Sequence, residues 1–377
     1  MSERESPSVN SSKRFMAVTA LVVAAAGGAA LFLAQCTRTR PMDAREADRL
    51  AGATLYRTYC GLCHGDQGEG YTADDANALN NQDFLVSVSD EFLRINIADG
   101  HPGTAMAAYA REAGGPLEAV DIDLLVAFIR GWQTEPNVEL SAEPIEGDIA
   151  NGRSVFAREC ASCHGTNGRG DSALSLDNGV FLRSASDAQI EYAIRVGRRG
   201  TPMPAFAGEL QDATIRDLTA LIRSWEADAD DTVPDAASEI GEGPAIINPD
   251  GDAPQFSALR EGRYVPSEEV GRAIEAGKRL VILDARPPSD YVRFHIVGAI
   301  PSPYYGVAEV IDRIPNDGTW VIAYCACPHA ASGRVMDYLR EHGFENTAVL
   351  DEGVLHWREE GFPVVEGPAP GILADAE

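Results

Sequence analysis

The sequence predicts a multidomain chain in which two all-α domains precede an α/β domain with a mainly parallel sheet. A domain-sized pattern of residues occurs twice, at an offset of about 100 residues. From residue 259 to about 367, short apolar strands alternate with helical stretches, an alternation typical of a parallel sheet. The length of 377 residues fits two or three such domains.

The composition indicates an acidic globular protein. Asp and Glu number 58 against 31 Lys and Arg, which gives a net charge of -27, and 45% of the residues are hydrophobic. This apolar content excludes a disordered or collagen-like chain. Nucleic-acid binding is excluded as a function, because Lys and Arg are the residues that neutralise phosphates. We expect small, neutral or basic partners, and acidic surface charge steers basic redox proteins.

The N-terminal residues, 1–45, are expected to be a signal peptide or membrane anchor. A basic stretch precedes an uncharged run of twenty residues, 15–34, which is long enough to span the hydrocarbon core of a bilayer. The residues around Cys36 resemble a bacterial lipoprotein cleavage box, although Gln35 replaces that family's small residue. An uncleaved signal anchor is favoured, and lipid on Cys36 is the alternative. Both place the remaining chain outside the cytoplasm.

Two five-residue motifs share the spacing Cys-x-x-Cys-His, which attaches haem c covalently. They are Cys60-Gly61-Leu62-Cys63-His64 and Cys160-Ala161-Ser162-Cys163-His164. Redox dithiols or zinc sites are the alternative interpretation, but the distal half of a haem site is also present in each repeat. We therefore expect two covalently attached haem c groups, with thioether bonds to Cys60, Cys63, Cys160 and Cys163.

Each repeat reads as a helix ending in the haem motif, a glycine-rich stretch, a short helix, a methionine loop and a closing amphipathic helix. This order resembles the class I cytochrome c fold, over residues 46–135 and again over 145–228. The tandem arrangement is similar to the di-haem subunit of cbb-type terminal oxidases. The resemblance implies that Gly52 and Gly152 lie where the first helix of each unit packs against the last.

The resemblance also implies the axial ligands of the iron. His64 and His164 would supply the proximal imidazoles, and Met106 and Met203 the distal thioethers, which raise the reduction potential. Iron with both axial positions filled suits outer-sphere electron transfer. Met106 lacks the flanking prolines usual in the family, and His101 lies five residues before it. His101 is therefore an alternative ligand to Met106 and would give a lower potential.

Residues 229–258 are predicted to be an acidic, flexible linker. From residue 226 to residue 258 the chain has nine acidic residues, no Lys or Arg, and four prolines. Such a composition is typical of an extended, solvated spacer. A tether of this length would let the third unit approach the haems or a separate partner.

The third unit, residues 259–367, is followed by a short tail, 368–377. Three apolar stretches predict strands, and one amphipathic stretch predicts a helix. The strands are Val281–Asp284, Trp320–Tyr324 and Ala348–Leu350, and the helix is Ser332–His342. The unit resembles the rhodanese family throughout its length, because Asp284-Ala285-Arg286, His295-Ile296, Tyr324-Cys325 and Asp351-Glu352-Gly353 occur in that family's order.

The resemblance implies that Cys325 attacks a sulfane sulfur and becomes a persulfide. A loop of inward-pointing N–H groups that leads into a helix near Ser332 would stabilise its thiolate. The loop after Cys325 is one residue longer than in the family and lacks the usual Arg and Gly, so it departs from the pattern of classical thiosulfate transfer. Cys327 is a candidate to resolve a persulfide, and His329 is a candidate acid or base.

Three functional hypotheses remain open from the sequence. The first is an electron carrier anchored to the bacterial inner membrane with its domains in the periplasm, which exchanges electrons with redox proteins such as a membrane oxidase or a quinol complex. The second is a sulfurtransferase or sulfur oxidoreductase, in which small sulfur compounds react at Cys325 and electrons leave through the haems. The third is an electron carrier whose rhodanese-like unit is catalytically silent and serves only in docking.

Overall fold

The computed structural model describes residues 44–73, 75–228, 246–326 and 330–369. Within these ranges, no helix combines the length and the apolar character needed to cross a membrane. The predicted anchor with Cys36 lies outside the described residues, as do Cys327 and His329. Residues 49–377 form one compact unit.

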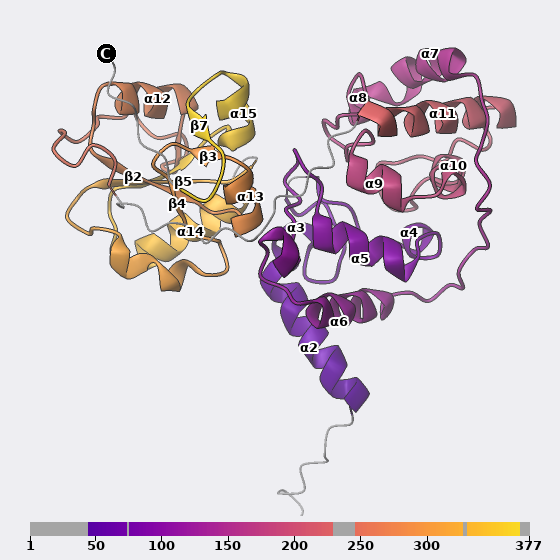
Figure 1. The fold of residues 1–377 in the computed structure, drawn as a ribbon, viewed down its shortest axis with the longest axis horizontal. Helices are drawn as coiled ribbons and strands as arrows, with labels where there is room; N and C mark the ends of the chain where they lie inside the picture. Colours follow the sequence, from indigo (N-terminus) through magenta and orange to yellow (C-terminus); the bar gives the residue numbers. More distant parts are fainter. Residues whose placement is uncertain (1–43, 74, 229–245, 327–329, 370–377) are drawn as a thin grey trace, which may run out of the picture. The chain divides into compact units, whose positions relative to one another are not determined.

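The first half of this unit is helical, as predicted (Figure 1). The first repeat contains α2 (Ala44–Tyr59), α3 (Gly61–His64), α4 (Gln82–Leu85), α5 (Asp90–Asp99), the 3-10 turn η1 (Arg111–Ala113) and α6 (Ala119–Arg130). The second contains α7 (Ile149–Glu159), α8 (Ala161–His164), α9 (Gly179–Ser184), α10 (Asp187–Val196), α11 (Asp212–Ser224) and the 3-10 turn η2 (Trp225–Asp228). The same five helices occur in the same order in both repeats.

The repeat extends to the residues that start the short helices. Asn81 and Ser89 cap α4 and α5 by accepting backbone N–H groups through their side-chain oxygens. Asn178 and Ser186 cap α9 and α10 in the same way. Each cap lies 97 residues from its counterpart, as Met106 lies 97 residues before Met203, so one offset holds for these helices and for the methionine loops.

The first and last helices of each domain cross in direct contact. A Cβ atom at Gly52 would lie 2.5 Å from the backbone oxygen of Leu124 on α6, and one at Gly152 would lie 2.3 Å from that of Asp217 on α11. Only glycine lets the two backbones approach this closely. The structure confirms the predicted packing of the first helix on the last.

The third domain is an α/β domain built on a five-stranded parallel sheet with the order β1-β6-β5-β2-β4. Its strands are β1 (Tyr264–Val265), β2 (Leu280–Asp284), β4 (Ile300–Pro301), β5 (Trp320–Tyr324) and β6 (Thr347–Leu350). A separate antiparallel pair joins β3 (His295–Ile296) to β7 (Val364–Val365). The helices are α12 (Ser267–Glu275), α13 (Pro288–Arg293), α14 (Ala330–Glu341) and α15 (Gly353–Glu359), with the 3-10 turns η3 (Val307–Glu309) and η4 (Ile311–Arg313).

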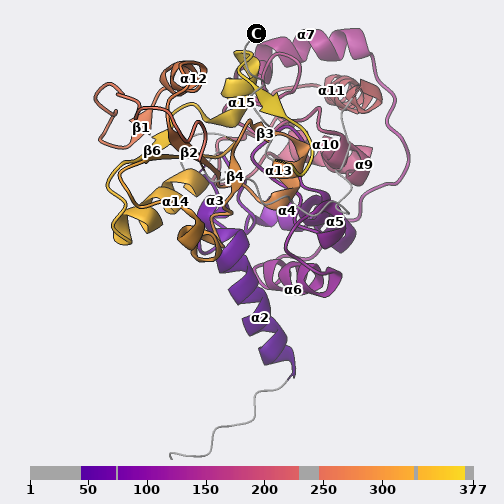
Figure 2. The same cartoon turned by 60° about the vertical axis from the view of Figure 1, so that its left-hand side comes forward.

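Helices cover both faces of the parallel sheet (Figures 1 and 2). Successive strand residues point to opposite faces, so the continuous apolar runs of β2 and β5 contribute side chains to a core on each face of the sheet. Ile282 and Ile322 pack in a core with residues of α12 and α15, whereas Val281 and Val321 pack in a core with residues of α14. The Cys325 loop follows β5 and leads into α14.

Residues 246–258 belong to the third domain, although their composition predicted a solvated linker. Ile247 is buried and pairs with Leu280, its N–H donating to the Leu280 carbonyl at 2.8 Å. The Phe256 ring lies 5.1 Å from that of Trp320. These apolar side chains bind a polar segment to the domain, because burying them removes apolar surface from water. Ile247 and Phe256 therefore attach the described part of the predicted linker to the domain, although most of its other residues are exposed.

Candidate functional site

The first Cys-x-x-Cys-His motif places its histidine in a defined orientation. His64 ends α3 and is only 8% exposed. Its Nδ1 lies 2.9 Å from the backbone oxygen of Asn77, so Nδ1 carries the proton and Nε2 keeps its lone pair. Burial lowers the pKa of His64, which keeps the imidazole neutral at neutral pH. A neutral ring pinned at Nδ1 is suited to bind a metal through Nε2.

The second motif repeats this geometry. His164 ends α8, is 8% exposed, and has its Nδ1 2.9 Å from the backbone oxygen of Leu174. Burial also lowers the pKa of His164. The two acceptor carbonyls carry no side-chain signature, so sequence reasoning did not identify Asn77 or Leu174. The cysteines differ in exposure, since Cys163 is exposed whereas Cys60 and Cys63 are partly buried.

The two methionine loops have matching hydrogen bonds. The N–H of Met106 donates to the Thr104 hydroxyl at 3.1 Å, and that of Met203 donates to the Thr201 hydroxyl at 3.2 Å. The Met106 carbonyl accepts the N–H of His101, as the Met203 carbonyl accepts that of Arg198. Both methionine side chains pack against the helical core.

His101 therefore occupies the position that Arg198 holds in the second loop. Its Nε2 lies 2.6 Å from the Oδ1 of Asn96, whose amide donates to the Ser184 hydroxyl at 2.9 Å. The side chains of His101 and Asn96 thus belong to a polar network that joins the two repeats. Sequence reasoning did not find this network, because Asn96 and Ser184 belong to no motif.

Each repeat thus supplies the parts that haem c requires. In each motif one cysteine lies about one helical turn before a buried, oriented imidazole and the other immediately precedes it, and a loop of fixed hydrogen bonding carries a soft sulfur donor. The residues present fit a covalently bound haem with histidine and methionine as axial ligands. Such a group supplies one-electron chemistry when it is bound.

Cys325 lies at the carboxyl edge of the parallel sheet, directly after β5. It is 5% exposed, and its Sγ lies 3.2 Å from the hydroxyl oxygen of Ser332 on α14. Its backbone oxygen accepts the N–H of Val354 at 2.9 Å. Ser332 itself is fully buried. The structure therefore joins the predicted nucleophile to a hydroxyl at the first turn of the following helix, where that hydroxyl can stabilise a thiolate.

A buried ion pair holds the neighbouring strand end. The Arg286 guanidinium donates to the Asp284 carboxylate at 2.7 and 2.9 Å, and the Tyr324 hydroxyl donates to the same carboxylate at 2.8 Å. Burial alone would lower the pKa of Arg286, but the carboxylate raises it. The Asp-Ala-Arg sequence therefore fixes the ends of β2 and β5, which position the Cys325 loop.

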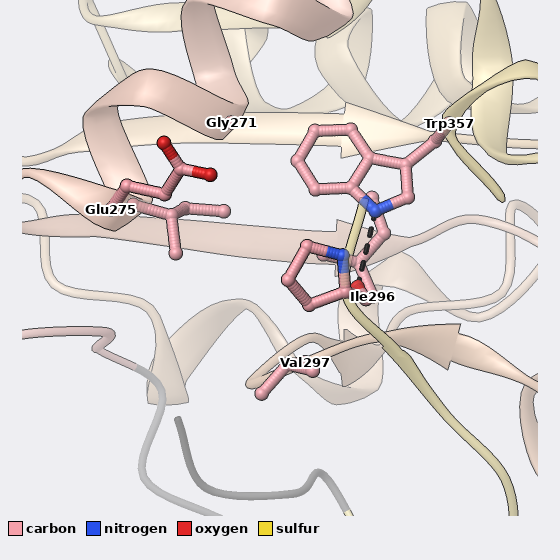
Figure 3. Close-up of a pocket in the computed structure, with 7 residues that line it drawn as sticks. Gly271, Glu275, Ile296, Val297 and Trp357 are labelled. Atoms are coloured by element: carbon pink, nitrogen blue, oxygen red, sulfur yellow. Dashed lines mark hydrogen bonds between the residues drawn. The ribbon is translucent and has the colours of Figure 1, made fainter. Parts of the chain in front are cut away.

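A small pocket opens elsewhere in this domain, between α12 and α15 (Figure 3). It is lined by Gly271, Ile274, Glu275, Ile296, Val297, Trp357 and Pro363. The indole N–H of Trp357 donates to the Pro363 carbonyl at 3.1 Å, so it is already satisfied. The lining holds no nucleophile, and we assign it no part in the chemistry of Cys325.

Comparison with known families agrees with this division of the chain. Residues 47–129 and 147–222 match the model of the cytochrome c oxidase, cbb3-type, subunit III family, and residues 267–360 match that of the rhodanese-like domain. The matches fall on the two helical repeats and on the α/β domain.

Individual relatives of the cbb3-type family match about half of the chain. The cbb3-type cytochrome c oxidase subunit FixP of Bradyrhizobium sp. (strain ORS 278) is 29% identical over 186 residues, which are 47% of this chain and 60% of the relative. Subunit CcoP of Rhodobacter capsulatus is 30% identical over 186 residues, which are 47% of this chain and 59% of the relative. The chain thus spans about three fifths of the length of these relatives.

Solved structures are similar to parts of the chain. The reducing HAO-like protein complex of Kuenenia stuttgartiensis contains a chain that is 22% identical, with a TM-score of 0.33; the match covers 46% of this chain and 95% of that one.

Proposed function

We propose that this chain, which joins two cbb3-type cytochrome c repeats to a C-terminal rhodanese-like domain, carries single electrons between extracytoplasmic redox proteins. Domains of this type imply covalently bound haem c. The observation that carries the proposal is the duplicated site, in which each buried histidine is held at Nδ1 by a backbone carbonyl. One haem in each repeat, with Met106 and Met203 as distal ligands, makes a two-electron relay.

The net charge and the N-terminal residues support a proposal for the partners and the location of the chain. The net charge of -27 favours basic redox proteins as donor and acceptor and gives encounter rates that fall with ionic strength. The uncharged run of residues 15–34 favours a tether to the bacterial inner membrane, with the domains in the periplasm. Lipid on Cys36 is the alternative tether.

A redox titration of the full chain tests the electron-carrier proposal. We expect two one-electron transitions in the visible spectrum, both with the absorption of six-coordinate haem c. A single transition, or a spectrum typical of five-coordinate iron, would contradict the assignment of two sites with filled axial positions.

A second function is favoured by the position of Cys325. Its sulfur lies 3.2 Å from the Ser332 hydroxyl at the edge of the sheet where catalytic loops of parallel α/β domains gather. A sulfur oxidoreductase would form a persulfide there, with Cys327 to resolve it and His329 as acid or base, and would pass electrons to the haems.

Two matched variants separate these functions. Reduction of the haems by sulfide or thiosulfate should be lost in Cys325→Ser and kept in Cys36→Ser if the chain is a sulfur oxidoreductase. Reduction that is indifferent to Cys325 would leave an electron carrier with a silent docking domain.

A further inference from the structure

A tyrosine cluster joins the rhodanese-like domain to the first cytochrome repeat. We define it as Tyr59, Tyr109, Tyr304 and Tyr305. The Tyr304 hydroxyl donates to the backbone oxygen of Tyr59 at 2.7 Å, and the Tyr109 hydroxyl lies 3.1 Å from that of Tyr304 and 3.2 Å from the same carbonyl. The Tyr305 ring stands 4.8 Å from the Tyr59 ring, edge to face. The backbone oxygen of Tyr59 and the hydroxyls of Tyr109 and Tyr304 therefore form one hydrogen-bonded group among the tyrosine rings.

The two phenols of the tyrosine cluster that hydrogen-bond to each other are buried. Tyr109 is 9% exposed and Tyr304 is 7% exposed. Burial raises the pKa of both phenols, so both keep their protons at neutral pH. Beside the cluster, the Ser289 hydroxyl donates to the Ala108 backbone oxygen at 2.7 Å, also in a buried position. The hydroxyls of Tyr109, Tyr304 and Ser289 each have a hydrogen-bond partner in the contact, whereas the buried hydroxyl of Tyr305 has none among the described residues.

This contact lies directly on the first haem motif. Tyr59 immediately precedes Cys60, and Leu62, inside the motif, packs against an apolar cluster that contains Tyr304 and Cys325. One apolar cluster thus connects the motif that would hold the first haem with the predicted sulfur nucleophile.

The second repeat lacks the tyrosine and leucine side chains that make this contact. At the positions of Tyr59 and Leu62 it has Glu159 and Ser162, both exposed, and at the position of Tyr109 it has Phe206, which has no hydroxyl. The two motifs are equivalent in haem-binding residues and differ on the face toward the third domain. The sequence difference and the contacts therefore both indicate that the third domain contacts the first repeat.

We propose that the rhodanese-like domain docks on the first haem motif through the tyrosine cluster and Leu62, so that electrons released at Cys325 enter the chain at the first cytochrome repeat. The exposed second motif, with Ser162 and Cys163, then faces external redox proteins. This inference rests on the sulfur-oxidoreductase candidate described above.

The electron balance of that step fits two haems. The Cys325 thiolate and one hydrosulfide ion form an S–S bond, and the hydrosulfide proton leaves to water. The products are the persulfide anion of Cys325, one proton and two electrons. Two haems, one held by the cysteines and histidine of each repeat, would accept these two electrons singly and would therefore be a sufficient oxidant. The first repeat is the natural point of entry for these electrons, because its Leu62 packs against the apolar cluster that contains Cys325.

Hydrogen–deuterium exchange of the full holoprotein tests the docking without any reaction. Leu62→Asp places a charge in the apolar contact, and Ser162→Asp is its matched control in the other motif. We expect amide exchange over residues 304–310 to become at least tenfold faster in Leu62→Asp and to stay unchanged in Ser162→Asp. Tyr304→Phe, which keeps the ring and loses one donor, should give a smaller change in the same direction. Unchanged exchange in both Leu62→Asp and Tyr304→Phe overturns the docking.

Anaerobic stopped-flow mixing with sodium sulfide tests the route. Haem reduction should slow at least tenfold in Leu62→Asp, keep its rate in Ser162→Asp, and be absent in Cys325→Ser. Reduction that depends on Cys325 but has the same rate in Leu62→Asp overturns the route and leaves the sulfur chemistry intact. Haem reduction that has the same rate in Cys325→Ser overturns both the route and the sulfur-oxidoreductase function. This holds even where hydrogen–deuterium exchange shows that the domains dock.

Discussion

Asn81 and Asn178 make the same hydrogen bond in opposite directions between the two cytochrome repeats. The amide of Asn81 donates to the backbone oxygen of Arg199 at 2.9 Å, and that of Asn178 donates to the backbone oxygen of Pro102 at 3.1 Å. Donors and acceptors are both 97 residues apart. Helix α5 packs on α9 in the same way that α10 packs on α4. The repeats therefore associate with approximate two-fold symmetry, with both methionine loops at their interface.

The two functions of these asparagines are separable. Asn81→Asp keeps the side-chain oxygen that caps α4 and loses the amide donated to the other repeat, whereas Asn81→Ala loses both. We expect Asn81→Asp to lower the free energy of unfolding by about 1 kcal/mol and Asn81→Ala by about 1 kcal/mol more. Thermal unfolding measures both variants. Equal losses would mean that the amide contributes nothing to the interface.

An ion pair across the same interface makes the stability of the fold decrease at low pH. The buried carboxylate of Asp83 accepts the Nε and the backbone N–H of Arg199 at 2.9 and 2.7 Å. Burial raises the pKa of Asp83, but these hydrogen bonds lower it below its ordinary value. The pair therefore stabilises the fold fully above the unfolded pKa of about 3.9, and this stabilisation is lost as the pH falls below that value.

The expected outcome is a loss of stability below about pH 4 that is weaker in Asp83→Asn. Thermal unfolding from pH 3 to pH 7 measures it. Arg199→Ala should lower the free energy of unfolding at pH 7, because it leaves a buried carboxylate short of a charged donor. If Asp83→Asn loses as much stability at low pH as the unaltered protein does, other carboxylates cause that loss.

Each cysteine pair should hold one haem. We expect Cys60→Ala/Cys63→Ala and Cys160→Ala/Cys163→Ala to lose one of two haems each, because thioether bonds form only at these sulfurs. The alkaline pyridine spectrum and the intact mass of the holoprotein measure the haem content. A double variant that keeps both haems would refute the site assignment for that repeat.

Substitution of Met106 or His101 decides the distal ligand of the first haem. His101 Nε2 is 2.6 Å from Asn96, whereas Met106 has the loop geometry of Met203. We therefore expect Met106→Ala to remove one sulfur-to-iron absorption band and to lower one potential by about 0.1 V or more, since axial ligands set haem potentials over about 0.8 V. His101→Ala should keep both bands. Loss of a band only in His101→Ala would make His101 the ligand.

Features with fixed spacing were predictable from the sequence. The haem motifs, the methionine loops and the contact of Gly52 with the last helix recur at set offsets, and the apolar runs of β2 and β5 mark a buried parallel sheet. Local patterns of this kind identify the elements that they build, so the two helical repeats and the α/β domain were correctly expected.

Contacts between domains were not predictable. Asp83 and Arg199 are 116 residues apart, Tyr59 and Tyr304 are 245 apart, and none of the four belongs to a motif. Such pairs depend on how folded domains meet, which periodicity does not encode. The one signal available was the loss of Tyr59 and Leu62 between the repeats. Ile247 was missed for a different reason, because the acidic composition around it masked two adjacent β-branched residues.

Ser332 should tune the reactivity of Cys325. Its hydroxyl lies 3.2 Å from Cys325 Sγ, and donation of its proton stabilises the thiolate relative to the thiol. A hydrogen bond to a charged group is worth about 1.5–3 kcal/mol, so Ser332→Ala should raise the pKa of the Cys325 thiol. At pH 7 alkylation of Cys325 by iodoacetamide should then slow by about tenfold or more.

Mass spectrometry of the peptide that contains Cys325, across a pH series, measures this rate separately for each cysteine. Ser332→Thr keeps a hydroxyl and is the control that should retain most of the rate. Because only the thiolate reacts, a lost hydrogen bond moves the whole pH profile to higher pH, whereas a merely loosened loop changes the plateau and leaves the midpoint in place. An unmoved midpoint in Ser332→Ala would show that Ser332 only packs against the sulfur.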